Sequence, residues 1–235
     1  MSVLKEGRPF IIPSLAAGFV LLIASIFVKM LPLSITIASF GCLSVVFSLF
    51  CIFFFRDPKI KITKGEGLIL SPCNGTVMEV IEDGDEKIIR VFLSIFSVHL
   101  QRSPVSGTVA NVTHKDGKFL AAWNPRAHIE NEQNIFTING EGGVYTVRQI
   151  AGLVARRCVS WVKSGDVLKA GDKIGMIKFG SQVDLHLPKQ AEIKVKPGGK
   201  VQAGITVAAL LNAVSPDTAS LNATLSMAAS SGVVK

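Results

Sequence analysis

The amino-acid sequence predicts a mainly β domain that follows a hairpin of two membrane-spanning helices. Three observations lead to this prediction. The first 55 residues are almost free of charge, the rest consists of short β-rich runs separated by glycine, and turn motifs recur among those runs. We expect three parts: a membrane hairpin over residues 1–56, a β domain over 57–211, and a flexible tail over 212–235, where alanine and serine dominate.

The hydrophobic residues of the chain are concentrated at its start. Of 235 residues, 49% are hydrophobic and 18% charged, which excludes a disordered chain, a collagen-like repeat and a coiled coil. Residues 10–28 and 30–55 carry no charge, and Lys29 separates them. Because about 20 apolar residues cross a bilayer as a helix, we predict helices over 10–28 and 33–55. Pro32 is well placed to begin the second helix.

A cleaved signal peptide is the alternative explanation for the first apolar run. No small-residue cleavage site follows Val28, and a second, longer apolar run comes directly after it, so the hairpin is favoured. Basic residues flank both ends of this hairpin: Lys5, Arg8, Arg56, Lys59, Lys61 and Lys64. Because basic flanks remain in the cytoplasm, we expect the β domain on the cytoplasmic side of the cell membrane.

The net charge of +8 indicates an acidic partner. Next to a membrane anchor, a basic surface more naturally meets anionic lipid headgroups than nucleic acid. One tyrosine and two tryptophans also offer little surface for stacking bases. We therefore predict a membrane phospholipid as the partner and no nucleic acid. The four cysteines and four histidines lack metal-ligand spacing, so we predict free thiols and no metal.

The β domain is expected to contain short strands bounded by turn residues. The predicted strands are Gly67–Ser71, Thr76–Glu82, Ile88–Ser94, Gly107–Thr113, Val144–Ile150, Val154–Val162, Lys173–Phe179, Gln182–Leu187 and Ala191–Val195. Residues 115–135 interrupt this rhythm, and we expect an irregular excursion there.

Two sequence motifs recur within the β domain. Ser71-Pro-Cys-Asn-Gly-Thr-Val77 returns as Ser103-Pro-Val-Ser-Gly-Thr-Val109. A Val-Lys-x-Gly motif followed by Ala-Gly begins at Val162 and again at Val195. This second pattern is typical of tight turns that feed strands in lipoyl- and biotinyl-type barrel sandwiches. We attribute both repeats to the fold, because a small β domain reuses its turn chemistry.

The Gly180-Ser181 step joins two predicted strands and has two interpretations. Spacing alone predicts an ordinary two-residue hairpin turn. A serine after glycine in a tight turn can instead attack the preceding carbonyl, because glycine has no Cβ to block the approach. Composition and periodicity leave this alternative open.

Six motifs follow one another along the chain in a fixed order. They are Phe54-Phe-Arg-Asp-Pro58; Ser71-Pro-x-x-Gly-Thr-Val77; Phe92-Leu-Ser-Ile-Phe-x-Val-His99 with Arg102-Ser-Pro-Val-Ser-Gly107; Gly117-Lys-Phe119 with Asn131-Glu132 and Asn134; Ala155-Arg-Arg157; and Gly175-x-Ile-x-Phe-Gly-Ser-x-Val-Asp184. With the preceding hairpin, they make the chain resemble the short, membrane-anchored phosphatidylserine decarboxylase proenzymes over about residues 1–210.

This resemblance implies a chain that cleaves itself. The Ser181 hydroxyl would attack the Gly180 carbonyl, and β-elimination would then release a β chain, 1–180, and an α chain, 181–235. Ser181 would become an N-terminal pyruvoyl group, the covalent cofactor. Its ketone would form a Schiff base with the amine of phosphatidylserine and accept electrons as CO₂ leaves, which yields phosphatidylethanolamine. The two chains are expected to remain associated, and we also expect a homo-oligomer.

The resemblance also assigns roles to individual residues. His99 is the candidate general acid or base, whereas His114, His128 and His186 are interpreted as structural. Longer relatives use an Asp-His-Ser relay for self-cleavage, and this chain has Asn74 at the aspartate position and Arg102 at the histidine position. Ser97 likewise replaces a common aspartate. An aspartate restored at position 74 could pair with either Arg102 or His99. Next to His99 it would raise the basicity of the imidazole, so we predict that Asn74→Asp speeds self-cleavage and leaves decarboxylation little changed.

Three alternatives remain at the level of sequence. The chemistry touches only the serine end of the lipid, so a related lipid such as archaetidylserine is a possible substrate. An uncleaved lipoyl-like membrane adaptor would need a lysine at the hairpin tip, where this chain has Gly180-Ser181. An inactive, uncut relative is consistent with Asn74. Cleavage into two fragments separates the enzyme from the other two.

Overall fold

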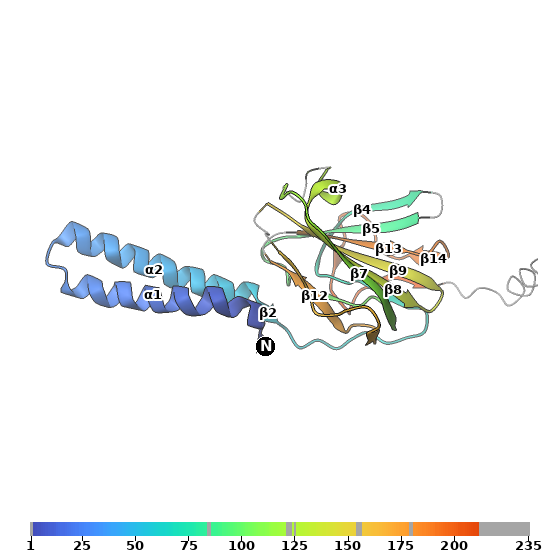
Figure 1. Cartoon of the computed structure of the whole chain (residues 1–235), viewed down its shortest axis with the longest axis horizontal. Coiled ribbons are helices and arrows are strands. Elements are labelled where there is room, and N and C mark those ends of the chain that lie inside the picture. The colour runs from blue at the N-terminus through green and yellow to red at the C-terminus, as the bar shows by residue number, and fades with distance from the viewer. Residues whose placement is uncertain are drawn as a thin grey trace, which may run out of the picture.

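The computed structural model describes residues 2–83, 86–120, 124, 126–153, 157–178 and 181–211. A helix hairpin projects from a β domain, and both ends of the hairpin lie at the domain (Figure 1). The predicted flexible tail, 212–235, lies outside the described residues.

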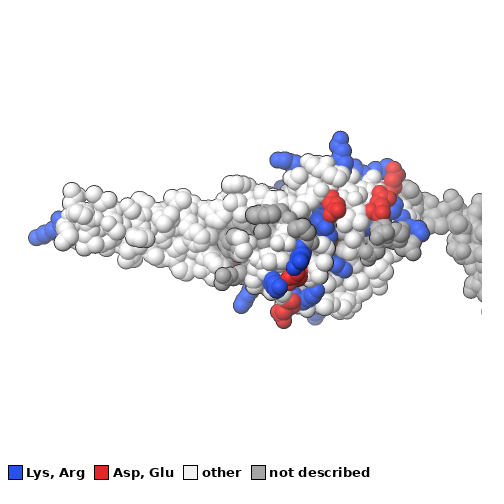
Figure 2. Space-filling view, turned by 90° about the horizontal axis from the view of Figure 1, so that it is seen from above, with Lys and Arg blue, Asp and Glu red and all other residues white. Residues whose placement is uncertain are grey.

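The hairpin consists of α1 (Arg8–Phe27) and α2 (Leu31–Phe54). At 1.5 Å per residue these helices are about 30 and 36 Å long, which matches the hydrocarbon thickness of a bilayer. Both are long and apolar enough to cross a membrane. Their bounds lie within two residues of the predicted ones, and Pro32 lies in the first turn of α2 as expected. The hairpin surface is uncharged between its tip, where basic atoms are visible, and the β domain, over which most of the charged side chains are spread (Figure 2).

Small residues let the two helices approach closely. A Cβ built on Gly18 would lie only 3.1 Å from the carbonyl oxygen of Gly41 in the facing helix. The hydroxyls of Ser34 and Ser48, each seven residues from Gly41, donate hydrogen bonds to carbonyls of α1 at 2.7 and 3.0 Å. A small residue at every seventh position keeps one face of a helix against its partner, and small and hydroxyl residues are the usual contact groups between helices in lipid.

Both ends of the hairpin are fixed to the β domain. Strand β1 (Ser2–Val3) pairs with β2 (Arg56–Asp57), so the chain segments before α1 and after α2 are bonded to each other. Before α1, the short 3-10 turn η1 (Lys5–Gly7) follows. The buried Asp57 carboxylate forms an ion pair with Lys173 and lies 3.9 Å from the guanidinium of Arg102. The hairpin therefore meets the domain through an ion-paired cluster around the buried Asp57 rather than through a free linker.

The β domain contains one curled eight-stranded antiparallel sheet and two smaller three-stranded sheets, with a single short helix, α3 (Ala127–Glu130), on the excursion among the described residues. The large sheet has the order β11 (Val167–Leu168), β7 (Gly107–Lys115), β8 (Gln133–Gly140), β9 (Gly143–Ala151), β13 (Ser181–Leu187), β5 (Glu86–Leu93), β4 (Gly75–Asp83) and β15 (Lys200–Val201). One of the smaller sheets has the order β10 (Cys158–Ser160), β12 (Lys173–Ile177) and β6 (Leu100–Arg102). The other has the order β14 (Ala191–Ile193), β16 (Val207–Leu211) and β3 (Leu68–Leu70). The predicted mainly β fold behind a helix hairpin is confirmed.

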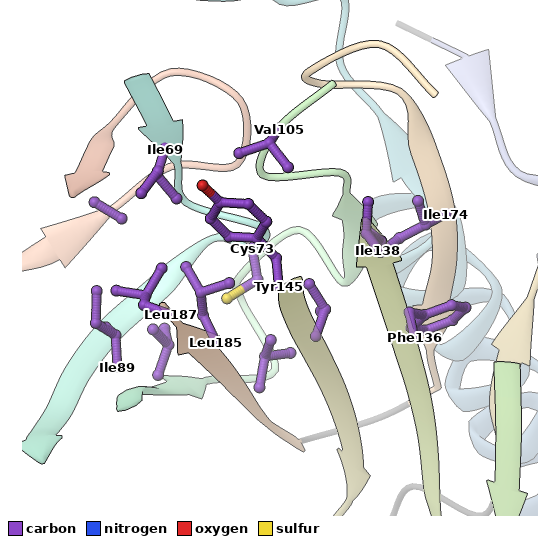
Figure 3. Close-up of a cluster of buried hydrophobic side chains, with 14 of the residues drawn as sticks. Ile69, Cys73, Ile89, Val105, Phe136, Ile138, Tyr145, Ile174, Leu185 and Leu187 are labelled. Carbon is purple, nitrogen blue, oxygen red and sulfur yellow. The ribbon is translucent and has the colours of Figure 1, made fainter. Parts of the chain in front are cut away.

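Alternating apolar residues of the large sheet form the core of the domain. Leu185, Phe136 and Tyr145 come from three neighbouring strands, and Ile174 from β12 in a smaller sheet joins them (Figure 3). All four are at most 1% exposed. The core is therefore enclosed between the curled sheet and the small sheets that cover it.

The predicted strands agree with the structure except where strands are short or polar. The predicted excursion over 115–135 is too long, because β8 already begins at Gln133. Gln133 and Asn134 are polar but buried, so the start of this strand lacks the apolar residues by which a buried strand is recognised in a sequence. Of the predicted strand over 154–162, only Cys158–Ser160 is a strand, and residues 154–156 lie outside the described residues. Seven further strands among the described residues were not predicted: β1, β2, β6, β8, β11, β15 and β16. Five of them have only two or three residues, and β8 begins with polar residues.

The two repeated motifs form the two halves of an approximate twofold arrangement. The hydroxyl of Ser71 donates to the carbonyl two residues later at 2.8 Å, and that of Ser103 does the same at 2.6 Å. The motifs also bond to each other, because the amide of Leu70 donates to the Pro104 carbonyl and the amide of Arg102 donates to the Pro72 carbonyl. The repeats are therefore turns of the fold, as the sequence indicated.

Candidate active site

The predicted cleavage position lies at the start of β13, in the middle of the large sheet. Gly180 lies outside the described residues, whereas Ser181 is the first residue of β13. The strand register places Ser181 opposite Leu93 of β5 on one side and Ala151 of β9 on the other. Both of these partners are completely buried. The backbone at Ser181 is therefore held from both sides.

The backbone of His99 is bonded to the strand that precedes the cleavage position. Its carbonyl accepts the amide of Ile177 at 3.1 Å, and Ile177 precedes Gly180 by three residues. The His99 side chain is only 1% exposed, and its ring lies against Phe54 at the end of α2, with the ring centroids 4.3 Å apart. The site is therefore at the end of the domain that faces the membrane hairpin.

The surroundings of His99 keep its imidazole neutral. The Nδ1 atom lies 2.9 Å from the Ser97 carbonyl, which can only accept, so Nδ1 carries the proton and donates it. Burial lowers the pKa of His99 to about 4, and the nearby positive charge of Arg56 lowers it further, against the bond from Ser97. A neutral ring with its proton fixed on Nδ1 exchanges protons through Nε2.

Asn74 and Arg102 are brought together, but in a different place. Both line one cavity of about 200 Å³, and His99 does not line it. The Arg102 guanidinium donates to the Gly171 carbonyl at 2.8 Å and faces Asp57. Burial lowers the pKa of Arg102, while Asp57 acts in the opposite direction. Of the two possible partners for a carboxylate at position 74, Arg102 is therefore the one that shares a cavity with it.

Asn74 has a structural counterpart in the other half of the domain. Its Oδ1 accepts the amide of Ala203 at 3.2 Å, while Ser106 Oγ accepts the amide of Ala170 at 3.0 Å. Asn74 and Ser106 occupy the same place in the two repeated motifs, and so do Ala203 and Ala170. This hydrogen bond therefore belongs to the turn of the repeat.

The chain matches a known protein family over most of its length. The phosphatidylserine decarboxylase family profile matches residues 47–209. The chain belongs to this family.

Several curated relatives support this membership. A phosphatidylserine decarboxylase proenzyme of Carboxydothermus hydrogenoformans is 44% identical over 175 residues, which cover 71% of this chain and 82% of the relative. The proenzyme of Solibacter usitatus is 41% identical over 165 residues, 70% of this chain and 80% of the relative. The proenzyme of Syntrophus aciditrophicus is 37% identical over 209 residues and covers 85% and 93% of the two chains. These matches confirm the resemblance to decarboxylase proenzymes.

Within this decarboxylase fold, the structure shows a buried polar network that sequence reasoning missed. Gln149 donates to Gln101 at 2.7 Å and accepts from Asn134 at 3.1 Å, and Asn134 bonds the ring of His114 at 2.7 Å. Gln149 lies opposite Val183, two residues into β13 from Ser181. Polar residues at inward positions of the strands were the available signal for this network. His114 is its exposed end, which agrees with a structural role.

The decarboxylase motif Asn131-Glu132 fixes the excursion next to the site. The Asn131 amide donates to the carbonyls of Leu120 and Ala151, and its oxygen accepts the amide of Leu120. Ala151 is the register partner of Ser181, so Asn131 anchors the loop at the edge of the site. Among the described residues, no three His, Cys, Asp or Glu side chains are grouped closely enough to hold a metal ion.

Asp184 of the decarboxylase motif that contains Gly180-Ser181 connects β13 to its neighbour β5. Its buried carboxylate accepts three hydrogen bonds from the Arg90 guanidinium at 3.2 to 3.3 Å. The Gln182 amide donates to the same carboxylate at 2.6 Å. Arg90 also reaches the exposed Glu79. Asp184 therefore holds the strand that begins at Ser181.

Proposed function

We propose that this chain is a proenzyme that cleaves itself between Gly180 and Ser181 and then decarboxylates phosphatidylserine to phosphatidylethanolamine. Family membership supports the proposal most directly, because relatives named phosphatidylserine decarboxylase proenzyme match most of the chain. The position of Ser181 at the start of a strand held on both sides also supports it. A related serine lipid, or an uncleaved adaptor, has no such support.

The residues around Ser181 fit a pyruvoyl group at the start of the α chain. Such a group supplies a carbonyl that accepts electrons when CO₂ leaves. Leu93 and Ala151 flank the position with buried apolar surface, which excludes water. His99 is neutral, so its Nε2 atom would take up or deliver a proton during the reaction. Arg102 and Asn74 support the surrounding turns.

The proposed α chain, 181–235, would remain bound to the β chain, 1–180, after cleavage. Its first strand, β13, pairs along its length with β5 and β9 of the β chain. The substrate lipid would come from the cytoplasmic leaflet, because basic residues flank both ends of the hairpin where it meets the domain. The expected homo-oligomer remains a prediction.

Electrophoresis and intact-mass measurement of the purified full chain test the cleavage. We expect a fragment of 180 residues and a fragment of 55 residues, the latter blocked to Edman degradation. The Ser181→Ala variant should run as one band. The cleaved protein should release CO₂ from phosphatidylserine in mixed micelles. A single uncut band for the wild-type chain would refute the proposed function.

A further inference from the structure

A groove of about 430 Å³ lies between the end of α2 and β15, next to the site. Its walls come from β4, β5, β15 and the loop 94–97, which follows β5. Arg56 and Lys200 are the charged residues that line it, and none of the described lining residues is acidic. Ser94 and Ser97 add hydroxyl groups. Two cations with hydroxyl donors form a suitable environment for a phosphate oxyanion.

Arg56 is fixed in place at the groove. Its guanidinium donates to the carbonyl of Phe53 at 2.8 Å and to the carbonyl of Phe96 at 2.6 Å. It also lies 3.9 Å from the centre of the Phe53 ring. A guanidinium carries five donor hydrogens, so these two bonds leave it the capacity to bind an anion. Arg56 thus connects the end of the membrane helix to the loop 94–97.

The groove lies beside the end of the apolar span. Arg56 follows the last residue of α2 by two positions, so it is next to the end of the apolar span. The neighbouring loop exposes Ile95 by 42% and Phe96 by 67%, and Phe53 on α2 is 41% exposed. These apolar side chains continue the lipid-facing surface of the hairpin. Apolar groups beside cations are typical of a surface that enters the membrane interface.

The groove is also close to the proposed cleavage position. Ser94 lines it and directly follows Leu93, which is the register partner of Ser181. Adjacent strands are about 5 Å apart, so a lipid with its phosphate in the groove would have its headgroup amine near the start of β13.

We propose that this groove binds the phosphodiester of a membrane phospholipid through Arg56 and Lys200, with Ile95 and Phe96 inserted among the neighbouring acyl chains. The choice of ligand rests on the proposed function. The groove would hold the substrate by a group that does not react, and it would place the reacting serine end at β13. Arg56 and Lys200 are thus positioning residues for the substrate.

Binding is tested on the full-length Ser181→Ala chain in a maltoside detergent, which contains no phosphate. The probe is dihexanoylphosphatidylglycerol, a soluble phospholipid without an amine, titrated by calorimetry. We expect Lys200→Gln and Arg56→Gln each to weaken binding by about fivefold or more, as for the loss of one charge-assisted contact. Arg56→Lys, which keeps the charge, should lose less. The control Lys163→Gln, an exposed lysine in the turn before β11 at the opposite edge of the sheet, should bind like the parent.

Two further ligands identify what the groove recognises. Dihexanoylglycerol, which has no phosphate, should bind at least about tenfold more weakly than the phospholipid. Inorganic phosphate should also bind more weakly, because it cannot use Ile95 and Phe96. Equal binding of inorganic phosphate would assign the groove to free phosphate and overturn the proposal. Absence of phospholipid binding, or equal effects of Lys200→Gln and Lys163→Gln, would also overturn it.

The failure of this inference can be told apart from the failure of the proposed function. The binding measurement uses an uncleavable chain, so it does not depend on self-cleavage or decarboxylation. In the cleaved wild-type background, Lys200→Gln should raise KM for phosphatidylserine and leave kcat within about twofold, because binding to a non-reacting group is lost equally in ground and transition states. A decarboxylase with unchanged KM in this variant would contradict the groove alone.

Discussion

At the scale of single residues, the neutral state of His99 has a measurable effect on stability. The folded protein holds the pKa of His99 at about 4, below the usual value of 6.5. Between these values the unfolded chain binds the proton more readily, so stability falls as pH falls from 6.5 toward 4, by about 3 kcal/mol at most. His99→Gln should reduce the fall in melting temperature between about pH 7 and pH 5.

The matched control for this prediction is His114→Gln. Hydrogen bonding to Asn134 raises the pKa of the exposed His114. The protonated His114 therefore stabilises the fold at low pH, and this stabilisation is lost as pH rises through the pKa of His114 in the folded state. Its replacement should therefore make the fall on acidification steeper, not shallower. Equal pH dependence in the wild type and His99→Gln would contradict the neutral, buried imidazole.

Position 74 is expected to tolerate a carboxylate without faster maturation. The carboxylate introduced by Asn74→Asp would still accept the Ala203 amide and would face Arg102, which already binds Gly171 and Asp57. A carboxylate paired with Arg102 would not raise the basicity of the His99 imidazole, so it would give no help in removing the proton from the Ser181 hydroxyl, contrary to the expectation from sequence. We expect the rate of cleavage in a pulse-chase to stay within about twofold, whereas Asn74→Ala, which loses the bond, should cost about 1 kcal/mol of stability. Severalfold faster cleavage in Asn74→Asp would give position 74 a role in the relay.

At the scale of elements, the Arg90–Asp184 pair should control how firmly β13 is held after cleavage. Removing one partner of a buried ion pair costs about 3 kcal/mol or more, because the other charge stays buried. In the cleaved protein, Asp184→Asn should therefore release the α chain at a lower urea concentration, as followed by size-exclusion chromatography. The control Glu79→Gln removes the exposed partner of Arg90 and should change release by well under about 1 kcal/mol. Equal effects of the two variants would contradict the prediction.

The helix hairpin depends on the close contact at Gly18. A side chain there would meet Val45 at 2.7 Å and the Gly41 carbonyl at 3.1 Å, so Gly18→Ile should force the helices apart. The adjacent exposed Ala17 provides the control, because Ala17→Ile adds bulk on the outward side. We expect a lower melting temperature in detergent only for Gly18→Ile. A similar loss in both variants would mean that the helices tolerate a wider separation.

At the scale of the whole molecule, the basic flanks predict which side of the membrane carries the β domain. A cysteine introduced at Glu66, in the exposed segment after the hairpin, should react with an impermeant maleimide only in permeabilised cells. A cysteine at Met30, in the turn between the helices, should react in intact cells. The background should lack Cys42 and Cys158, the two cysteines that are not buried. The opposite labelling pattern would place the proposed active site outside the cell.

Local sequence patterns were sufficient for the hairpin and for most of the long strands. Two uncharged runs and Pro32 gave the helix bounds, and alternation gave the strands around Val147 and Leu185. Strands of two or three residues, such as β11 and β15, are too short to show alternation and form through pairing with distant neighbours. Gln149 and Asn134 could not be predicted as partners, because burial of polar residues depends on contacts far apart in the sequence.

The candidate site was predictable only in part for the same reason. The motifs predict that Ser181 and His99 act in one site, which stays a prediction, and no local pattern could show that His99 packs on Phe54 of the membrane helix. The repeated motifs align Asn74 with Ser106 in the sequence, but only the fold shows that each accepts the backbone amide of an equivalent alanine.

The central place of β13 changes how the protein can recover from unfolding. Before cleavage, β13 is joined to β12 by the chain, so refolding is a reaction within one molecule. After cleavage the same strand must be recaptured from solution between β5 and β9, and recovery becomes second order in protein concentration. The precursor should regain its fold on dilution from denaturant, whereas the mature protein should lose its short chain irreversibly at low concentration. After maturation, the rate of unfolding would therefore determine how long the protein stays active.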